Sequence, residues 1–314
     1  AVVGALKSSE KPMILAGGGA NDPESEKALL ELAERHDLPV AVSLRGKGVF
    51  PENHRLFLGL CGMHGSLAAN RATHEADFIL AVGTRFSDRT TGKADRFASS
   101  AKIVHVDLDP AEIGKNVSSE WSLVGSSSSV LGSLLVALEG WGRAPRAWQE
   151  TLAGWREEDR ARLALDSLGF SPRRILLAIR KALGDRALVT TDVGQHQMWA
   201  AQHFEPCGSR SFITSGGLGT MGFGLPSAMG AAFAAPDRPL ACITGDGSFL
   251  MNIQELDTCC RYGIPVKIFL FNNGSLGMVR QWQELFYSER YAHTVTDGLV
   301  DFALQVASGP VGEG

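Results

Sequence analysis

The stretch ITGDGSFLMNIQELDTCCRYGIPVKIFLFNNGSLGMVRQWQ, residues 243–283, decides the fold of this chain. It starts on a short apolar run that breaks at the glycines around Asp246, continues as a helical pattern, and returns to a second apolar run closed by Asn272-Asn273. This order predicts a strand, a turn, a helix and a second strand. Because such a connection makes the strands parallel, their carboxyl ends share one sheet edge, and Asp246 and Asn273 are expected to meet there.

The predicted pair of Asp246 and Asn273 suits a magnesium ion. Magnesium prefers a few protein oxygens together with phosphate oxygens and water. We expect the helix that begins near Ser248 and runs through Tyr262 to direct its free amide groups to the same place, so that metal and helix terminus hold a diphosphate. Gly-Asp-Gly and Asn-Asn are also common in ordinary turns. Joined by a helix and a strand of suitable length, they favour the diphosphate site.

Composition bounds the classes of function. The 314 residues suffice for two domains, and a net charge of -4 with 44% hydrophobic residues indicates neither a basic nucleic-acid surface nor an acidic disordered tail. A small-molecule partner is therefore expected, and no nucleic acid. We find no apolar run of membrane-spanning length and no signal peptide at the start, so we expect no membrane contact. The five cysteines lack paired metal spacing, which is typical of reduced thiols in a cytoplasmic protein.

The first part of the chain has the order strand, glycines, helix and strand. The run PMILAGGG (residues 12–19) predicts a buried strand that ends in Gly17, Gly18 and Gly19, and Asp22 predicts the N-cap of the following helix. This order predicts a doubly wound parallel sheet. The three glycines lack the Gly-x-Gly-x-x-Gly spacing, so a tight turn is favoured over a ligand cradle.

Charged residues follow two further predicted strands, residues 77–83 and 102–107. The segments TRFSDR (84–89) and DLDP (107–110) come directly after them. Arginines and carboxylates in this position lie at the crevice where parallel sheets bind nucleotides. One such cluster is equally well explained by a solvated loop, but two on one edge favour a nucleotide. The stretch 46–65 is expected to be mostly loop, either a binding loop or a self-packed surface loop.

The motifs of the second half resemble a known family. GDGS followed by NN resembles the thiamine diphosphate motif, and NNGSLGMVRQWQELFY resembles the catalytic subunit of acetolactate synthase. The resemblance implies that Asp246, Asn273 and the backbone carbonyl of Ser275 hold Mg2+. The motif GQHQMWAAQ implies that Gln195 and His196 hold the terminal phosphate of thiamine diphosphate, although a lone histidine is more often a packing residue.

The resemblance also assigns apolar residues. Met221, within the glycine-dense run SGGLGTMGFG, is expected to force the two cofactor rings into a bent shape, although the glycines alone are explained by close helix–sheet packing. Met278 and Trp282 lie four apart, a spacing usually found in cores, but the resemblance places them at the substrate pocket. Met221, Met278 and Trp282 are thus the expected catalytic residues. The expected thiamine diphosphate contacts are Gln195, His196, Gly219, Met221, Gly245, Asp246, Gly247, Ser248, Asn273, Gly277 and Met278.

AGGG, GMHG, GTRFSDR and DLDPAEIGKN resemble the FAD-binding central domain of acetolactate synthases, where the flavin takes no part in the main reaction. The expected FAD contacts are Gly17, Gly18, Gly19, Gly62, Met63, His64, Gly83, Thr84, Arg85, Asp88, Arg89, Asp107 and Asp109. The sequence departs from the family at three positions. Ser87 stands in place of a second aspartate, Cys61 in place of leucine, and Ser126 in place of an acidic residue.

The expected fold is α/β, with two doubly wound parallel-sheet domains. We expect a central FAD-binding-type domain at residues 1–140, a linker with a helix at 141–170, and a thiamine diphosphate-binding domain at 171–314 that is shortened at its C-terminus. Within the linker, the charged run WREEDRARLALDSL (155–168) is expected to be a solvated helix. The resemblance implies that pyruvate is decarboxylated and its two-carbon unit joined to a second pyruvate or to 2-ketobutyrate, in branched-chain amino-acid biosynthesis. It also implies a homodimer or homotetramer and a small regulatory subunit.

The chain begins with Ala1 and stops on GPVGEG, so we expect a piece of a longer protein. Family members carry an N-terminal pyrimidine-binding domain whose glutamate activates the cofactor. No segment here supplies it, and we expect little activity from this polypeptide alone. Two alternatives stay open: another thiamine diphosphate-dependent 2-keto acid decarboxylase or oxidase, and a non-catalytic fragment that binds FAD or dimerises.

Overall fold

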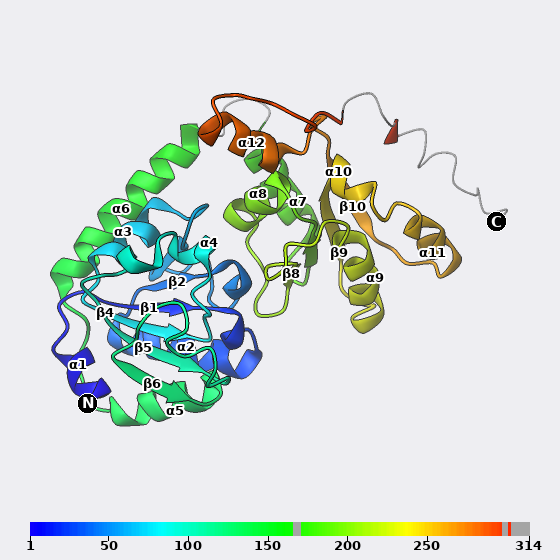
Figure 1. The fold of residues 1–314 in the computed structure, drawn as a ribbon. Coiled ribbons are helices and arrows are strands. Elements are labelled where there is room, and N and C mark those ends of the chain that lie inside the picture. Colours follow the sequence, from blue (N-terminus) through cyan, green and yellow to red (C-terminus); the bar gives the residue numbers. More distant parts are fainter. Residues whose placement is uncertain (166–170, 297–300, 303–314) are drawn as a thin grey trace. The chain divides into compact units, whose positions relative to one another are not determined.

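Two parallel sheets organise the chain (Figure 1). The structure is a computed structural model, and it describes residues 1–165, 171–296 and 301–302. Contacts divide the chain into a first unit, Ala1–Arg174 with Glu205–Arg210, and a second unit, Ile175–Phe204 with Ser211–Gly314. Each unit carries its own sheet, which confirms the predicted α/β class.

The first sheet has the strand order β3-β2-β1-β4-β5-β6, and every neighbouring pair is parallel. Its strands are β1 (Pro12–Ala16), β2 (Val40–Val42), β3 (Phe57–Leu60), β4 (Phe78–Val82), β5 (Lys102–Asp107) and β6 (Trp121–Val124). The chain leaves β1 toward one side of the sheet and later returns to β4 on the other side. Doubly wound sheets bind ligands beyond the carboxyl ends of strands at such a reversal.

Most of the stretch 46–65 is loop, as predicted, but residues 57–60 form strand β3, which the prediction did not include. Only four residues form the strand, and glycine occupies one of them. A short run of this kind carries little local signal, and its pairing with β2 decides its structure.

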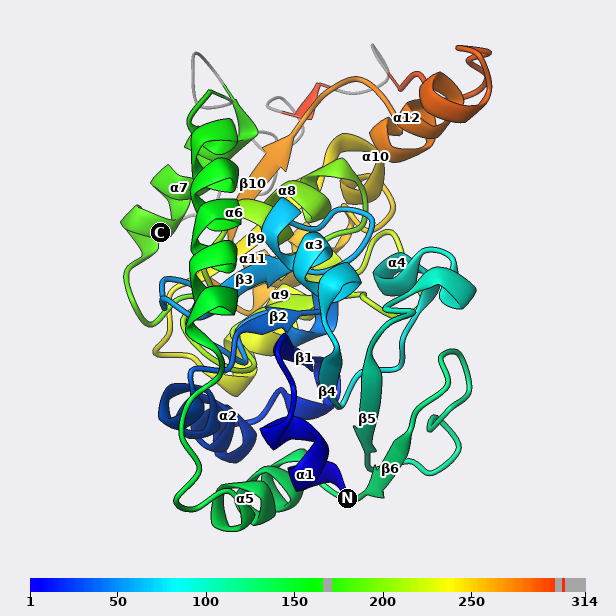
Figure 2. The ribbon, with the colours of Figure 1, turned by 90° about the vertical axis from the view of Figure 1, so that its left-hand side faces the viewer.

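Helices cover both faces of the first sheet (Figure 1). Helices α3 (Leu67–Glu75) and α6 (Arg146–Leu165) pack on the face that carries Met13, Leu15 and Ile79. Helix α2 (Pro23–His36) packs beside α5 (Ser127–Ala137), which contacts β5 (Figure 2). The shorter helices of this unit are α1 (Val2–Lys7), α4 (Asp88–Thr91), η1 (Gly18–Ala20), η2 (Leu44–Gly46) and η3 (Ala94–Arg96).

Helix α2 begins where the sequence predicts. The carboxylate of Asp22 accepts hydrogen bonds from the N–H groups of Glu24 and Ser25 at 3.1 and 2.9 Å. Pro23 occupies the first helical position, where its missing N–H costs nothing. The predicted N-cap is confirmed.

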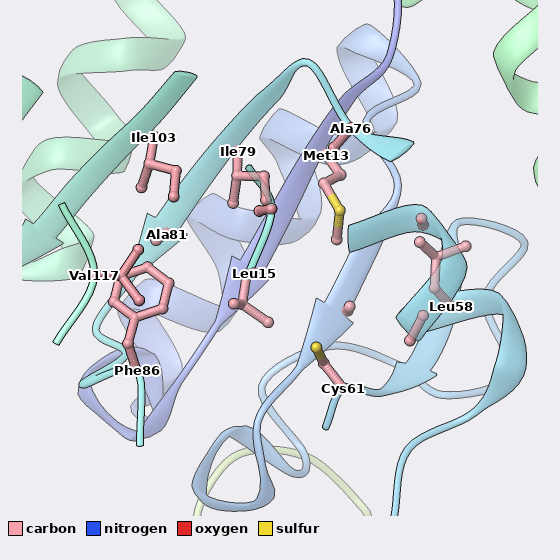
Figure 3. Packing of buried hydrophobic residues seen from close by; sticks show 14 of the residues in the cluster. Met13, Leu15, Leu58, Cys61, Ala76, Ile79, Ala81, Phe86, Ile103 and Val117 are labelled. Carbon is pink, nitrogen blue, oxygen red and sulfur yellow. The ribbon is translucent and has the colours of Figure 1, made fainter. Parts of the chain in front are cut away.

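The core of the first unit joins the sheet to α3 and α6 (Figure 3). Met13, Leu15 and Ile79 are at most 1% exposed and lie together with Leu58 and Cys61. Neighbouring strand residues point to the opposite face and are also buried. Burial on both faces explains why β1 and β4 are continuous apolar runs.

Helix α6 is exposed over most of the charged run that we predicted to be solvated, but its first part packs into the core. Trp148 and Leu152 are 3% and 2% exposed and belong to the core, and the indole N–H of Trp148 donates to the Pro12 carbonyl at 3.1 Å. The carboxylate of Asp159 accepts from the first amide groups of α3, Leu67 N–H and Ala68 N–H, at 3.0 and 2.8 Å. These contacts are tertiary, so the charge pattern alone does not reveal them.

The second sheet has the order β10-β9-β7-β8, again with parallel pairs. Its strands are β7 (Leu188–Thr191), β8 (Phe212–Thr214), β9 (Leu240–Gly245) and β10 (Lys267–Phe271). The helices from residue 172 onward are α7 (Pro172–Leu183), α8 (Gln195–His203), α9 (Gly224–Ala234), α10 (Asp246–Phe249), α11 (Glu255–Arg261) and α12 (Gly277–Phe286). In the described residues, we find no helix with the length and apolar character needed to cross a membrane.

The strands of the deciding stretch are confirmed, but its single helix is not. Gly245 of β9 pairs in register with Phe271 of β10, so the two strands end side by side. The helix predicted from Ser248 through Tyr262 is instead two short helices, α10 and α11, separated by residues 250–254. Asn252 lies in this break, and its side chain bonds to a carbonyl of another segment, a contact that the local pattern does not contain.

We predict that Trp148→Ala lowers the free energy of unfolding by about 3–5 kcal/mol, because it empties core space and removes the bond to the Pro12 carbonyl. Urea denaturation followed by circular dichroism measures the change. The control is Val136→Ala on the exposed side of α5, which should change the free energy by less than about 0.5 kcal/mol. A loss at Trp148 no larger than at the control would contradict the packing of α6.

Candidate functional site

Three neighbouring strands of the second sheet end at the residues predicted to hold diphosphate and metal. Gln195 and His196 open α8 after β7, Asp246 follows β9, and Asn273 comes two residues after β10. Because β9 pairs in parallel with both β7 and β10, these ends lie along one edge.

Thr296 connects Asp246 to the turn that contains Asn273. The Thr296 hydroxyl donates to Asp246 Oδ2 at 2.6 Å, and the Thr296 N–H donates to the Gly274 carbonyl at 2.9 Å. The Asp246 carboxylate is 4% exposed. The structure thus brings Asp246 close to the Asn273 turn, as the sequence predicts.

Asn273 also reaches Gln195. Its Nδ2 donates to Gln195 Oε1 at 3.1 Å, and its Oδ1 accepts from the N–H of Ser275 at 3.2 Å. A Cβ atom at Gly277 would lie 2.1 Å from Gln195 Oε1 and 2.7 Å from Asn273 Nδ2. Glycine at the start of α12 is therefore what lets these two side chains meet.

Met221 lies at the same edge, across from Gly247. A Cβ atom at Gly247 would meet Leu276 Cδ2 at 2.6 Å and Met221 Cε at 3.8 Å. Gly219 is exposed, with a φ of +65° that favours glycine. The hydroxyl of Ser248 donates to the Val193 carbonyl at 2.8 Å, so this predicted contact residue uses its hydroxyl within the fold.

His196 is a buried ring with an unsatisfied nitrogen. The residue is 6% exposed, and its Nε2 has no hydrogen-bond partner in the described part of the chain. Burial lowers the pKa of His196 to about 4, against an opposing hydrogen bond with the Asp192 backbone. Gly245 packs against the ring, since a Cβ there would lie 2.6 Å from Nδ1. A buried polar atom without a partner is costly, and a phosphate group of a ligand at this edge fits it.

The oxygen atoms at this edge fit Mg2+. Asp246 and Asn273 provide a carboxylate and an amide oxygen, the hard ligands that Mg2+ takes together with phosphate and water. Ser275 and Val295 form an isolated antiparallel bridge. Its backbone hydrogen bonds run from Leu276 N–H to the Thr294 carbonyl and from Thr296 N–H to the Gly274 carbonyl, and neither bond uses the Ser275 carbonyl. Within the described residues, we find no cluster of three His, Cys, Asp or Glu side chains that would hold a metal instead.

Met278 and Trp282 do not form a core pair. Both are partly exposed, and α12 contains no fully buried residue. The Trp282 ring contacts Phe286 edge-on, with ring centroids 5.3 Å apart. The interpretation from spacing alone is therefore wrong, and the assignment to a substrate pocket stays a prediction.

In the first unit, the glycines after β1 and β4 pack directly on each other. A Cβ atom at Gly17 would lie 2.3 Å from the Gly83 carbonyl oxygen, and one at Gly19 would lie 2.7 Å from Gly83 Cα. Gly18 faces Arg45, whose Cβ is 3.0 Å from the corresponding position. These glycines allow the chain segments after two neighbouring parallel strands to pack closely at the reversal of the sheet, as the tight-turn interpretation predicts.

The loop that contains Gly62, Met63 and His64 meets the segment after β4. Met63 N–H donates to the Arg89 carbonyl at 2.9 Å. Burial lowers the pKa of His64, and the nearby Arg89 guanidinium lowers it further. The structure thus brings together two of the motifs predicted to contact FAD.

The remaining predicted FAD residues lie around these two segments. Arg85, Asp88 and Arg89 are exposed, whereas Thr84 is buried and its carbonyl bonds to His105 Nε2 at 2.9 Å. Two carboxylates follow β5. Asp107 accepts from the N–H of Asp109 at 3.0 Å, and Asp109 accepts from Ala111 N–H at 2.9 Å.

The three departures from the family have different structural settings. Cys61 lies in the core, where burial raises its pKa to about 11. Cys242, which is buried in the second unit and is not one of the three departures, likewise has its pKa raised by burial, to about 12. Ser126 caps α5, since its hydroxyl accepts from Ser129 N–H at 3.3 Å and so supplies the acceptor that an acidic residue would. Ser87 is exposed.

Two residues at the second sheet edge were not predicted, Thr296 and Asp192. Asp192 is 1% exposed and follows β7 directly. An aspartate after an apolar strand is the same signal that identified Asp246, and it could have been used here. Thr296 contacts Asp246 across 50 residues, and no local pattern marks it.

Comparisons with known proteins agree with the two units. The family model "Thiamine pyrophosphate enzyme, central domain" matches residues 1–134, and "Thiamine pyrophosphate enzyme, C-terminal TPP binding domain" matches residues 192–309. The acetolactate synthase large subunit of Parasynechococcus marenigrum is 48% identical over 300 residues, which cover 95% of this chain and 48% of that protein.

Two further relatives come from other organisms. The acetolactate synthase large subunit of Haemophilus influenzae is 43% identical over 313 residues, 98% of this chain and 55% of that protein. The probable acetolactate synthase large subunit of Methanocaldococcus jannaschii is 45% identical over 304 residues, 95% of this chain and 51% of that protein. The chain spans about half the length of the curated relatives it matches. These matches confirm the predicted resemblance.

We predict that His196 makes the fold less stable in acid. Its pKa is about 4 in the folded state, below the ordinary histidine value of 6.5, so the unfolded chain takes up a proton first as the pH falls. Stability is therefore full above pH 6.5 and falls by about 3 kcal/mol toward pH 4. Unfolding at pH 7 and pH 4 should show this loss in the wild type and a smaller one in His196→Gln. The exposed His74→Gln serves as control and should keep the full loss.

Proposed function

The chain belongs to the thiamine pyrophosphate enzymes as a homologue of acetolactate synthase large subunits, and we propose that it binds thiamine diphosphate with Mg2+ in acetolactate synthesis. The observation that carries the proposal is the meeting of Asp246, the Asn273 turn and the unsatisfied His196 at one sheet edge. One carboxylate, one amide and one buried imidazole together suit a metal-bound diphosphate.

At this edge each residue has a separate task. Asp246, Asn273 and the Ser275 carbonyl hold Mg2+. Gln195 and His196 bind the terminal phosphate, which gives His196 Nε2 the partner that the fold does not provide. Gly245, Gly247 and Gly277 have no side chains that would fill the space beside the diphosphate. When bound, thiamine diphosphate supplies the electron sink that lets a 2-keto acid lose carbon dioxide.

Met221 and α12 serve the other end of the site. Met221, beside Gly247, supports the bent shape of the cofactor. Met278 and Trp282 line the substrate pocket, in which Trp282, supported edge-on by Phe286, sets the room for the second keto acid. Pyruvate is the first substrate, and pyruvate or 2-ketobutyrate the second.

We also propose that the first unit, within residues 1–140, binds FAD. Support comes from its strand order, in which the glycines after β1 and β4 pack on each other at the reversal of the sheet. Arg89 beside His64 makes this region positive, which suits the FAD phosphates, and Asp107 and Asp109 suit ribose hydroxyls. Residues 141–170 connect it to a thiamine diphosphate domain at 171–314.

The relatives support a proposal about the partners of the protein, and its cysteines support one about its location. Several of them are named large subunits, which supports a small regulatory subunit as partner of a homodimer or homotetramer. The five cysteines form no disulfide in the described part of the chain, which supports the reducing cytoplasm as location.

The product identifies the reaction. A polypeptide that carries this chain, supplied with pyruvate, thiamine diphosphate, Mg2+ and FAD, should form acetolactate, detected as acetoin after acid treatment. Addition of 2-ketobutyrate should give a second product. Acetaldehyde as the main product would instead assign a decarboxylase.

We predict that Asp246→Asn weakens binding of thiamine diphosphate in the presence of Mg2+ at least about tenfold, because the carboxylate is the charged ligand of the metal. Isothermal titration calorimetry measures the affinity. Asp257→Asn is the matched control: Asp257 forms an exposed ion pair with Arg261 at 2.6 Å, and its loss should leave the affinity unchanged. EDTA should abolish binding to the wild type. Equal affinities of wild type and Asp246→Asn would refute the metal site.

A further inference from the structure

Asp192 is a buried carboxylate whose oxygens are occupied by backbone amides. Its Oδ1 accepts from the N–H groups of Val193 and Gly222, both at 2.8 Å, and its Oδ2 accepts from Gly224 N–H at 3.1 Å. At 1% exposure, it has little contact with water. It thereby ties the end of β7 to the glycine-rich run 215–224, which contains Met221.

Asn252 holds the same peptide from the other side. Its Nδ2 donates to the Gly222 carbonyl at 2.6 Å, so both polar groups of Gly222 are fixed by side chains. Gly222 has a φ of +84°, and a Cβ there would lie 2.7 Å from Asn252 Nδ2. A Cβ at Gly224 would lie 3.0 Å from Asp192 Cβ. These glycines therefore permit a close approach to Asp192 and Asn252.

We propose that Asp192 and Asn252 are positioning residues that fix the backbone next to Met221 and so aim this side chain at the thiamine part of the cofactor. The inference rests on the proposed function, because it takes Met221 to contact the bound cofactor. Residues 217–220 of the same run are exposed, whereas Gly222 is buried. The Met221 end is thus the anchored end of the run.

Methionine needs such an anchor. Its side chain is unbranched and flexible, so it holds a defined position only when its backbone is fixed and its neighbours limit its rotamers. Aspartate suits the anchoring role because an ionised carboxylate only accepts, and can take three N–H groups at once. In Asp192→Asn, an NH2 group would replace one carboxylate oxygen. This group cannot accept from the backbone N–H that the oxygen binds, so that hydrogen bond would be lost.

The two halves of the cofactor site are held by different side chains, and this separates positioning from general folding. The bond between His196 and the Asp192 backbone does not use the Asp192 carboxylate, so Asp192→Asn retains it. Gln195, His196, Asp246 and Asn273 face the diphosphate. Asp192 and Asn252, together called the Asp192 clamp, hold the run 215–224 that contains Met221. A variant that loosens only the clamp should weaken the contact with the rings and spare the diphosphate. A variant that merely destabilises the unit should weaken both.

The test compares two ligands on the whole chain in the presence of Mg2+. Calorimetric titration of Asp192→Asn with thiamine diphosphate should show about tenfold weaker binding than the wild type, while inorganic pyrophosphate should bind within about twofold of it. The matched control is Asp159→Asn, since this carboxylate also accepts from two backbone N–H groups, in α3 of the first unit. Its affinities for both ligands should equal those of the wild type.

Hydrogen exchange followed by mass spectrometry gives a readout without ligand. Peptides that contain Gly222 and Gly224 should exchange at least about tenfold faster in Asp192→Asn, while β9 keeps its wild-type rate. Asn252→Ala should show the same pattern and decides the question if Asp192→Asn does not fold. Equal weakening of both ligands, or unchanged exchange in the run 215–224, would overturn the inference. A wild type that binds no thiamine diphosphate refutes the proposed function instead, and exchange still decides whether the clamp fixes the run.

Discussion

The parallel pairing of β9 with both β7 and β10 is the constraint on which the candidate site depends. Parallel strands end at the same edge, so residues that are 50 or more positions apart along the chain meet without any local signal between them. The register of the strands decides which residues meet at this edge: Gly245 lies beside Phe271, and Thr191 beside Ile243. A shift of one residue would turn each of these side chains to the other face and separate Asp246 from the Asn273 turn.

Both sheets use glycine for close approach, but to different ends. In the first unit, Gly17 and Gly19 pack on Gly83, so backbone meets backbone. In the second unit, Gly245 packs against the ring of His196 and Gly277 against Gln195, so backbone makes room for functional side chains. The first arrangement supports tight turns after two neighbouring strands, and the second lets polar side chains gather at the strand ends.

The parts that the sequence predicts correctly are those with local causes. The β9 and β10 strands are continuous apolar runs, and Asp22 caps α2 through bonds to residues two and three positions on. The parts that it misses have distant causes. Strand β3 exists through pairing with β2, the break before α11 contains Asn252 bound to Gly222, and α6 packs through Trp148. Met221 was identified by resemblance, whereas the bonds of Asp192 to Gly222 and Gly224 join residues 30 and 32 positions apart and have no local signal.

The burial of Cys61 and Cys242 determines how readily these cysteines are oxidised. With a pKa of about 11, only about one Cys61 side chain in ten thousand is a thiolate at neutral pH, and for Cys242 the fraction is smaller still. Peroxides attack the thiolate, so these sulfur atoms are shielded from oxidative damage by chemistry as well as by packing. Cys260 is exposed and lacks this shielding by packing, so we expect oxidation of the molecule to begin there.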